Sequence, residues 1–436
     1  MRAVDQRAWA TQLIESEARG LMSRLDLIQP FVLNETMVTA AAPPYDALLT
    51  IERFLFQSRE HLRGQVREYL AWLRGPGRSA DNGEQQRRFV ILRMAFNNVL
   101  AQFDLFTEAI TQRSEHRTGV WLSGLDVLAA DALRVNVEGF TEAPVVCYLA
   151  RGAGAAIRRT RTRLPGGRSN PVAIIRIPRE RMIGSGIASS LIHEVGHQGA
   201  AQLGLVESLR AEITKAARTN PQGGWDVWYR WISEIIADCW SVGKIGITST
   251  VGLLAVVSLP KFFVFRPSGT DPHPMPYMRV LISTRIGEAL YPHPQWAAMR
   301  ATWKRLYPIA DQTAERRADI DRHEATIGAF VDLLLNHRSP ALRSRRLGEI
   351  WPVTERRPDQ LLALYKKWNG DFGVMARQSP SLVFAAVGQA KVAGLITPER
   401  ESPILRDLLS AWAVRSSLDV TRRHTPPIVM PPRRAS

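Results

Sequence analysis

Cysteine is scarce in this sequence of 436 residues, with Cys147 and Cys239 as its only two. Two cysteines exclude a disulfide-dense scaffold and any cysteine-cluster metal site, and they fit a reducing compartment. The N-terminal stretch also lacks a charged segment followed by an apolar segment and a small-residue cleavage site, so no secretory signal is expected. We therefore expect a cytoplasmic protein.

Long apolar runs are missing as well. The best candidate, Ile245–Leu259, lies between Lys244 and Pro260 and is shorter than the roughly 20 residues that a membrane-spanning helix needs. We expect a buried core segment here and no transmembrane span, with membrane insertion as the minor alternative. The sequence has no internal repeat, and Gly152-Ala-Gly154 lacks the third glycine of a dinucleotide-binding fingerprint.

Acidic residues are outnumbered, because 41 Asp and Glu face 57 Lys and Arg and leave a formal net charge of +16. Such an excess predicts affinity for acidic protein, nucleic acid or anionic lipid. A solvated basic surface without a partner explains it equally well, and no specific nucleic-acid-binding module is recognisable. Charge alone therefore assigns no function, and the oligomeric state stays open.

What is present is a mainly helical pattern interrupted by a short β-rich stretch. Apolar spacings of three, four and seven residues predict helices before residue 135 and again after about residue 300. Runs rich in β-branched residues at Pro144–Leu149 and Val172–Ile177 predict two strands. We expect an α+β fold with four parts: an N-terminal helical region at 1–135, a core at 136–300, a C-terminal helical region at 301–420, and a disordered, basic, Pro-rich tail at 421–436.

The most informative segment runs from Ser185 to Gly204 and is predicted to be one helix ended by glycine. His193 and His197 are one helical turn apart, so their Cβ atoms lie on one face about 5–6 Å from each other. Two such imidazoles can bind one zinc ion at about 2.0–2.1 Å each. Glu194 lies about 100° around the helix from His193, beside the metal, where it suits a general base.

A third ligand is expected from the next helix, Trp225–Trp240, which is apolar except for a few residues that include Glu234 and Asp238. Buried carboxylates are rare unless they are paired or bind metal. Glu234 as the third ligand, with Asp238 accepting a hydrogen bond from a ligating histidine, accounts for both. Two ordinary ion pairs with arginines are the alternative. The longer motif with a third histidine is absent, because Ala200 and Leu203 stand at its glycine and histidine positions.

This order of residues resembles the gluzincin metallopeptidases, in which His-Glu-x-x-His is followed by Glu-x-x-x-Asp. The likeness covers about residues 140–300 and implies a zincin-like core with a small sheet, an active-site helix and a Zn²⁺ cofactor. The helical regions on either side have no counterpart in it.

A second element, Asp271-Pro-His273 followed by Arg279, resembles the His-Pro-x-x-x-x-Arg element of HtpX-type and CAAX-prenyl-protease-type members. The resemblance implies that His273 stabilises the tetrahedral intermediate and that Arg279 orients the cleft or binds substrate. A structural histidine in a turn is the alternative for His273. Those relatives are membrane-embedded, so small soluble gluzincins are the better comparison.

The same resemblance implies that the strand at 172–177 is an edge strand along which an extended peptide binds, with Val172, Ile174 and Arg176 contacting it. We expect a zinc-dependent endopeptidase acting on a peptide or protein substrate. The competing hypothesis is a catalytically latent, zinc-stabilised interaction protein whose helical regions cover the cleft or bind a partner.

The segment 151–168 is predicted to border the cleft and to favour an acidic substrate or partner. Its arginines are Arg151, Arg158, Arg159, Arg161, Arg163 and Arg168. Elsewhere, His116 and His323 stand among charges and are expected on solvated helix faces. The tryptophans at 225, 228 and 231 are expected in the core or in a cleft wall.

Overall fold

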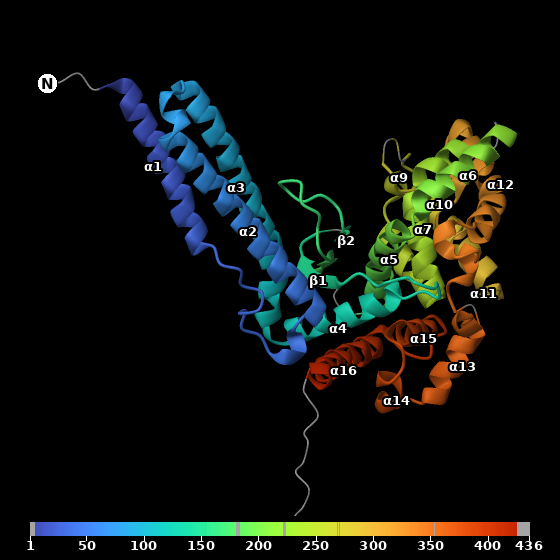
Figure 1. The fold of residues 1–436 in the computed structure, drawn as a ribbon. Helices are drawn as coiled ribbons and strands as arrows, with labels where there is room; N and C mark the ends of the chain where they lie inside the picture. The colour runs from blue at the N-terminus through green and yellow to red at the C-terminus, as the bar shows by residue number, and fades with distance from the viewer. Residues whose placement is uncertain are drawn as a thin grey trace, which may run out of the picture.

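The computed structural model describes residues 5–152, 154–179, 184–220, 224–267, 269, 271–352 and 354–424. Within these ranges the chain is mainly helical with one small mixed sheet, which confirms the predicted α+β class. The helices form a long N-terminal arm (residues 6–111) and a larger body (residues 185–424), with the sheet and helix α4 connecting them (Figure 1).

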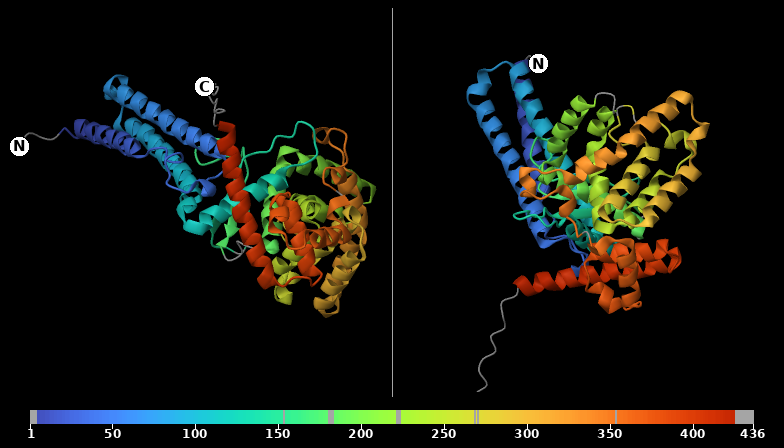
Figure 2. Two further views of the ribbon diagram at one scale, coloured as in Figure 1. Left: turned by 90° about the horizontal axis from the view of Figure 1, so that it is seen from below. Right: turned by 90° about the vertical axis from the view of Figure 1, so that its right-hand side faces the viewer.

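The arm consists of α1 (Gln6–Leu27), α2 (Tyr45–Arg74) and α3 (Asn82–Thr111). These helices lie side by side and project away from the body (Figures 1 and 2). The apolar stripes read from the sequence form their common core, in which Ile51 and Phe106 are fully buried. Amphipathic spacing therefore explains why each helix forms and which face it buries.

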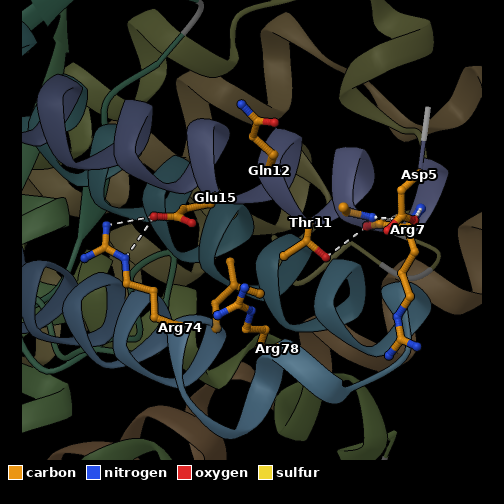
Figure 3. A pocket seen from close by; sticks show the side chains of 9 residues that line it. Asp5, Arg7, Thr11, Gln12, Glu15, Arg74 and Arg78 are labelled. Carbon is orange, nitrogen blue, oxygen red and sulfur yellow. Dashed lines mark hydrogen bonds and ion pairs between the residues drawn. The ribbon is translucent and has the colours of Figure 1, made fainter. Parts of the chain in front are cut away.

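Polar contacts close the free end of the arm, where α1 meets the end of α2 (Figure 3). Arg74 pairs with Glu15 at 2.8 Å, and Arg7 donates hydrogen bonds to the carbonyl oxygens of Ser79 and Ala80 at 2.7 and 3.2 Å. These side chains surround a hollow of about 470 Å³. Its polar groups are largely paired with one another, so we regard it as a feature of helix packing.

By length and composition alone, the helical stretch 82–114, which comprises α3 and the turn after it, passes the criteria for a membrane-crossing helix. Core helices of soluble proteins pass the same criteria, and 39% of its most apolar window is buried in the fold.

A buried ion pair between Arg113 and Asp126 lies where the arm joins the body. Arg113, in the turn after α3, donates from Nη1 to Oδ2 of Asp126 at 2.8 Å and from Nη2 to the carbonyl oxygen of Cys147 at 2.7 Å. Asp126 lies on α4 (His116–Leu133) and also accepts from the Cys147 amide at 2.7 Å. A Cβ at Gly119 would lie 2.2 Å from the carbonyl oxygen of Arg113, so only glycine permits this approach.

The sheet contains β1 (Val145–Ala150), β2 (Ala156–Arg158) and β3 (Ala173–Pro178). The first and last of these confirm the two predicted strands. The strand order is β1-β3-β2, with β3 parallel to β1 and antiparallel to β2. The prediction that residues 172–177 form an edge strand is therefore wrong, because the short β2, which the sequence pattern does not reveal, pairs with the side of β3 that was expected to be free.

The body is built from helices that follow the sheet. They are α5 (Ser185–Gln202), α6 (Leu205–Thr219), α7 (Trp225–Ile245), α8 (Ile247–Val257), α9 (Lys261–Val264), α10 (Pro276–Leu290), α11 (Pro294–Leu306), α12 (Ala314–Asn336), α13 (Pro358–Trp368), α14 (Phe372–Ala376), α15 (Pro380–Val392) and α16 (Pro398–His424). The expected core segment at 245–259 corresponds to α8 and the residues beside it, and most of α8 is buried.

The body has one continuous apolar core that draws on α4, on one face of the sheet and on helices from α5 to α16. The segments 136–300 and 301–420 thus pack into a shared core, and their independence as domains stays a prediction. Trp225, Trp228 and Trp231 are buried in it as expected. His323 is buried as well, 6.1 Å from the Trp231 ring, so its predicted solvated position is wrong.

The C-terminal segment begins as helix. Residues 421–424 continue α16, whereas the rest of the predicted tail, 425–436, lies outside the described residues.

Candidate metal centre

Helix α5 presents the two histidines as its sequence predicts. It ends near Gly204, which has a positive φ of 59° and reverses the chain into α6. The rings of His193 and His197 meet edge to face with their centroids 4.8 Å apart. Their nitrogens therefore converge on one side of the helix.

Helix α7 brings the carboxylates, and small residues set how closely it approaches α5. A Cβ on Gly196 would lie 2.8 Å from Cβ of Trp240, and one on Gly199 would lie 2.3 Å from the Trp240 ring. This contact fixes the register in which Glu234 faces the two histidines. The close packing is the physical reason for small residues on the α7-facing side of α5.

His193, His197 and Glu234 form a group that could hold a metal ion, with their ligand atoms within 4.8 Å of one another. Nε2 of His193 lies 3.2 Å from Oε2 of Glu234, and Nε2 of His197 lies 3.5 Å from Oε1. Ligands arranged tetrahedrally at about 2.0–2.1 Å from zinc are about 3.3–3.4 Å from each other. The two nitrogen-to-oxygen distances are close to this spacing, and the donor set could therefore hold a metal ion.

The carboxylate of Glu234 supports this fit. Its Oε2 is enclosed and has no hydrogen-bond partner of good geometry, although imidazole nitrogens stand around it. Burial raises the pKa of Glu234, but its interactions with the His193, His197 and His273 side chains outweigh burial and hold the pKa far below its usual range. A buried carboxylate oxygen that lacks a well-aligned hydrogen bond is costly and calls for a cation.

Behind His193 lies a second layer of charge. Nδ1 of His193 is 2.8 Å from Oδ1 of Asp238, and Asp238 accepts two hydrogen bonds from Arg279. Burial raises the pKa of Asp238, but Arg279 and His193 outweigh it and lower the pKa below its ordinary value. For His193, burial lowers the pKa and Asp238 raises it, with a net rise to about 9. A carboxylate behind a ligating histidine fixes the ring and strengthens it as a ligand.

Glu194 is buried beside the histidines, with 8% of its surface exposed. Its carboxylate makes no hydrogen bond or ion pair with any residue in the described part of the chain. An unengaged carboxylate at this place is free to accept a proton.

His273 reaches the site from the loop before α10. Its Nε2 lies 3.1 Å from Oε2 of Glu234, while its Nδ1 lies 2.6 Å from Oδ1 of Asp271, which also accepts from the His273 amide at 2.9 Å. The hydrogen bond to Glu234 raises the pKa of His273, burial lowers it, and Asp271 adds to the rise. Half of the His273 side chain is exposed, so its ring stands between the buried ligands and solvent.

A cavity of about 630 Å³ adjoins this ring and includes both His273 and Arg279 in its wall. Val257, Leu259 and Phe263 supply an apolar side. Pockets of this size and mixed lining are typical of ligand sites.

The C-terminal region anchors the start of α5. Lys391 on α15 donates to Oγ of Ser185 and to Glu401, each at 2.8 Å, and Glu401 accepts from the Ser185 amide at 3.3 Å. A carboxylate at a helix N-terminus interacts favourably with the helix dipole and stabilises the helix.

The sequence analysis did not predict a role for Glu401 or for Asp271. For Asp271, the Asp-x-His spacing was an available signal.

Of the remaining predicted residues, the three on the sheet lie apart from the metal group and Arg279 lies beside it. Val172 and Ile174 are buried in the core shared with the arm. Arg176 lies on the sheet face that points to the arm. In the β2–β3 pair it stands opposite Ala156. Arg279 is 13% exposed at its side chain and is engaged by Asp238.

Comparison with known proteins gives no relative: no family model, no curated protein and no solved structure matches the chain.

Proposed function

We propose that this protein is a zinc-dependent endopeptidase. The observation that carries the proposal is the convergence of His193, His197 and Glu234 beside a buried Glu194 that has no partner among the described residues. Three protein ligands leave the fourth position that a catalytic zinc requires.

Zinc, when bound by these residues, supplies Lewis acidity and brings the pKa of a water molecule to about 7. Glu194 accepts the proton of the attacking water and transfers it to the leaving amine. His273 donates from Nε2 to the developing oxyanion, and Asp271 holds the opposite ring nitrogen so that the ring keeps its orientation. The apolar side of the adjoining cavity receives a substrate side chain.

The test combines metal content with turnover. We expect near one zinc per chain in the wild type, loss of zinc in His193→Ala and Glu234→Ala, and peptide-library cleavage by the wild type that Glu194→Gln abolishes while retaining its zinc. Zinc-loaded wild-type protein that cuts no peptide would refute the enzyme and leave only a metal site.

The second candidate is a zinc-stabilised interaction protein without turnover, and one observation favours it. Nε2 of His273 lies as close to Glu234 as the two helix histidines do, at 3.1 Å from Oε2. His273 is outside the group whose ligand atoms lie within 4.8 Å of one another, so a shift of its loop would be needed to add a fourth nitrogen and close the site as structural zinc sites are closed. His273→Ala separates the two: an enzyme keeps its zinc and loses turnover, whereas a closed structural site loses zinc affinity and stability.

A further inference from the structure

A third hollow, also of about 470 Å³, lies on the face of the sheet that points to the arm. It contains three arginines and is called the arginine pocket below. Its lining consists of Leu105 from α3, Tyr148 from β1, Ala156, Ile157, Arg158, Arg159 and Thr162 from β2 and the turn after it, and Ile174 and Arg176 from β3.

The sheet register places this pocket away from the metal centre. Arg158 is paired with Ile174, and Ala156 with Arg176, so these positions share one face. Ile174 belongs to the arm core, whereas Ile175 and its neighbour Cys147 on β1 point to the body core that contains α5. The arginine pocket and the metal ligands therefore lie on opposite sides of the sheet.

The charges in the pocket are unpaired. Arg158, Arg159 and Arg176 form no ion pair with any carboxylate in the described parts of the chain, and Nε of Arg176 is enclosed without a hydrogen-bond acceptor. Arg168 shows the contrast, because it is bound to Ser58 and Gln57 on α2. A buried donor left unsatisfied is costly, more so when it carries charge. A ligand that brings acceptors and negative charge would remove that cost.

Tyr148 adds a neutral donor. Burial raises its pKa, as does Glu108, while Arg176 and Arg158 lower it, with a net rise that keeps the hydroxyl protonated. The charges of Arg158 and Arg176 both act on this hydroxyl, which places it within reach of the same ligand as the two guanidinium groups.

The side chains that line the arginine pocket indicate which class of ligand it binds. Guanidinium groups bind carboxylates through paired hydrogen bonds, and the apolar Leu105, Ile157 and Ile174 suit the methylene groups of a peptide. Only one aromatic side chain lines the pocket, which gives no stacking platform for the bases of a nucleic acid. We propose that the arginine pocket docks an acidic segment of a partner or substrate protein through its carboxylate side chains.

Binding of a short fluorescein-labelled peptide of glutamate and leucine tests this, measured by anisotropy on the full chain. The Glu194→Gln background prevents cleavage, so the result is independent of the proposed peptidase activity. We expect the Arg158→Ala/Arg176→Ala double variant to lose about tenfold in affinity for each arginine removed. The matched control is Arg67→Ala/Arg93→Ala, which removes the same charge from exposed arginines of the arm that do not line the pocket.

Equal losses in both double variants would overturn the proposal, because they would indicate binding to net charge alone. Stronger competition by inorganic phosphate or by a single-stranded oligonucleotide than by unlabelled peptide would overturn the choice of a protein segment. If the alanine variant fails to fold, Arg158→Glu provides a second test: it should reduce binding of the glutamate peptide and bind a lysine-and-leucine peptide instead. A folded Arg158→Glu protein that still prefers the acidic peptide would refute the site.

Discussion

Arg279 on α10 holds Asp238 on α7 through both carboxylate oxygens, with Nε 2.7 Å from Oδ2 and Nη2 2.9 Å from Oδ1. The guanidinium also passes 3.4 Å from Nδ1 of His193. This paired geometry is the strong form of a charged hydrogen bond. It joins Arg279 to the carboxylate that contacts His193 of the candidate metal group.

The first prediction concerns Arg279. Arg279→Ala leaves Asp238 buried without its cation, which costs about 3–5 kcal/mol for a buried pair, and it weakens zinc affinity about 10–100-fold as supporting residues do. Chemical denaturation and competitive zinc titration measure the two effects. Arg285→Ala on the same helix, in an exposed pair with Glu288, is the control and should change neither. A variant with unchanged stability and zinc affinity but a raised KM would instead indicate the substrate-binding role that the sequence resemblance implied.

The second prediction is a pH dependence of zinc binding. The pKa of His193 is raised to about 9 in the metal-free protein, so below that pH the ring carries a proton that must leave before Nε2 can bind metal. Zinc affinity should therefore rise with pH, by about tenfold per unit for this one proton, and level off as pH passes 9. Calorimetry in buffers of different ionisation enthalpy measures the released protons.

The same raised pKa affects the stability of the metal-free fold. Protonation of His193 stabilises this fold fully below the ordinary histidine pKa of 6.5, and the stabilisation is lost as pH rises through 9.

Asp238→Asn is the control for this proton count. Removing the charge that raises the pKa of His193 should reduce the number of protons released at neutral pH. Identical binding heats in all buffers for the wild type would show that His193 is already neutral and contradict the prediction.

The third prediction concerns the contact between α5 and α7. Glycine-to-alanine changes inside helices ordinarily stabilise by about 0.5–1 kcal/mol. At Gly199 the added Cβ would lie 2.3 Å from the Trp240 ring, and overpacking of this kind costs about 1–3 kcal/mol. Gly64→Ala on α2, where nothing lies within 4 Å of the new methyl group, should stabilise the protein. Thermal unfolding of the two variants should therefore shift in opposite directions, and shifts in the same direction would contradict the packing described for α5.

The fourth prediction addresses the joint of the arm. Asp126→Ala leaves the buried Arg113 cation unpaired and frees the Cys147 amide, so we expect a loss of about 3–5 kcal/mol in unfolding free energy. Urea denaturation measures it. Glu142→Ala, which breaks an exposed pair with Arg134, should have little effect. A similar small effect in both variants would mean that the joint does not depend on its ion pair.

Much of the metal centre could be predicted from the sequence because its parts are local. The spacing of His193 and His197 fixes their common face through helix geometry alone. The carboxylates of Glu234 and Asp238 could be singled out because they lie in an otherwise apolar helix, and a buried carboxylate needs a charged partner or a metal. The two longer strands could be predicted for a similar reason, since β-branched residues cluster there between turn residues.

The misplaced features depend on contacts that sequence spacing does not encode. The strand order β1-β3-β2 follows from the pairing of the short β2 with β3, and three residues carry no readable periodicity. The charged residues around His323 in the sequence predict a solvated position, whereas the packing of α12 against Trp231 buries it.

By itself, then, the sequence determined the α+β class, the helices and the two-histidine face, because propensity and periodicity act over a few residues. Only the tertiary structure decided that Arg279 supports Asp238, that His273 stands next to Glu234, and that Arg158 and Arg176 share a hollow. Each of these relationships joins separate elements through packing, and packing depends on the shapes of surfaces that meet only in the folded chain.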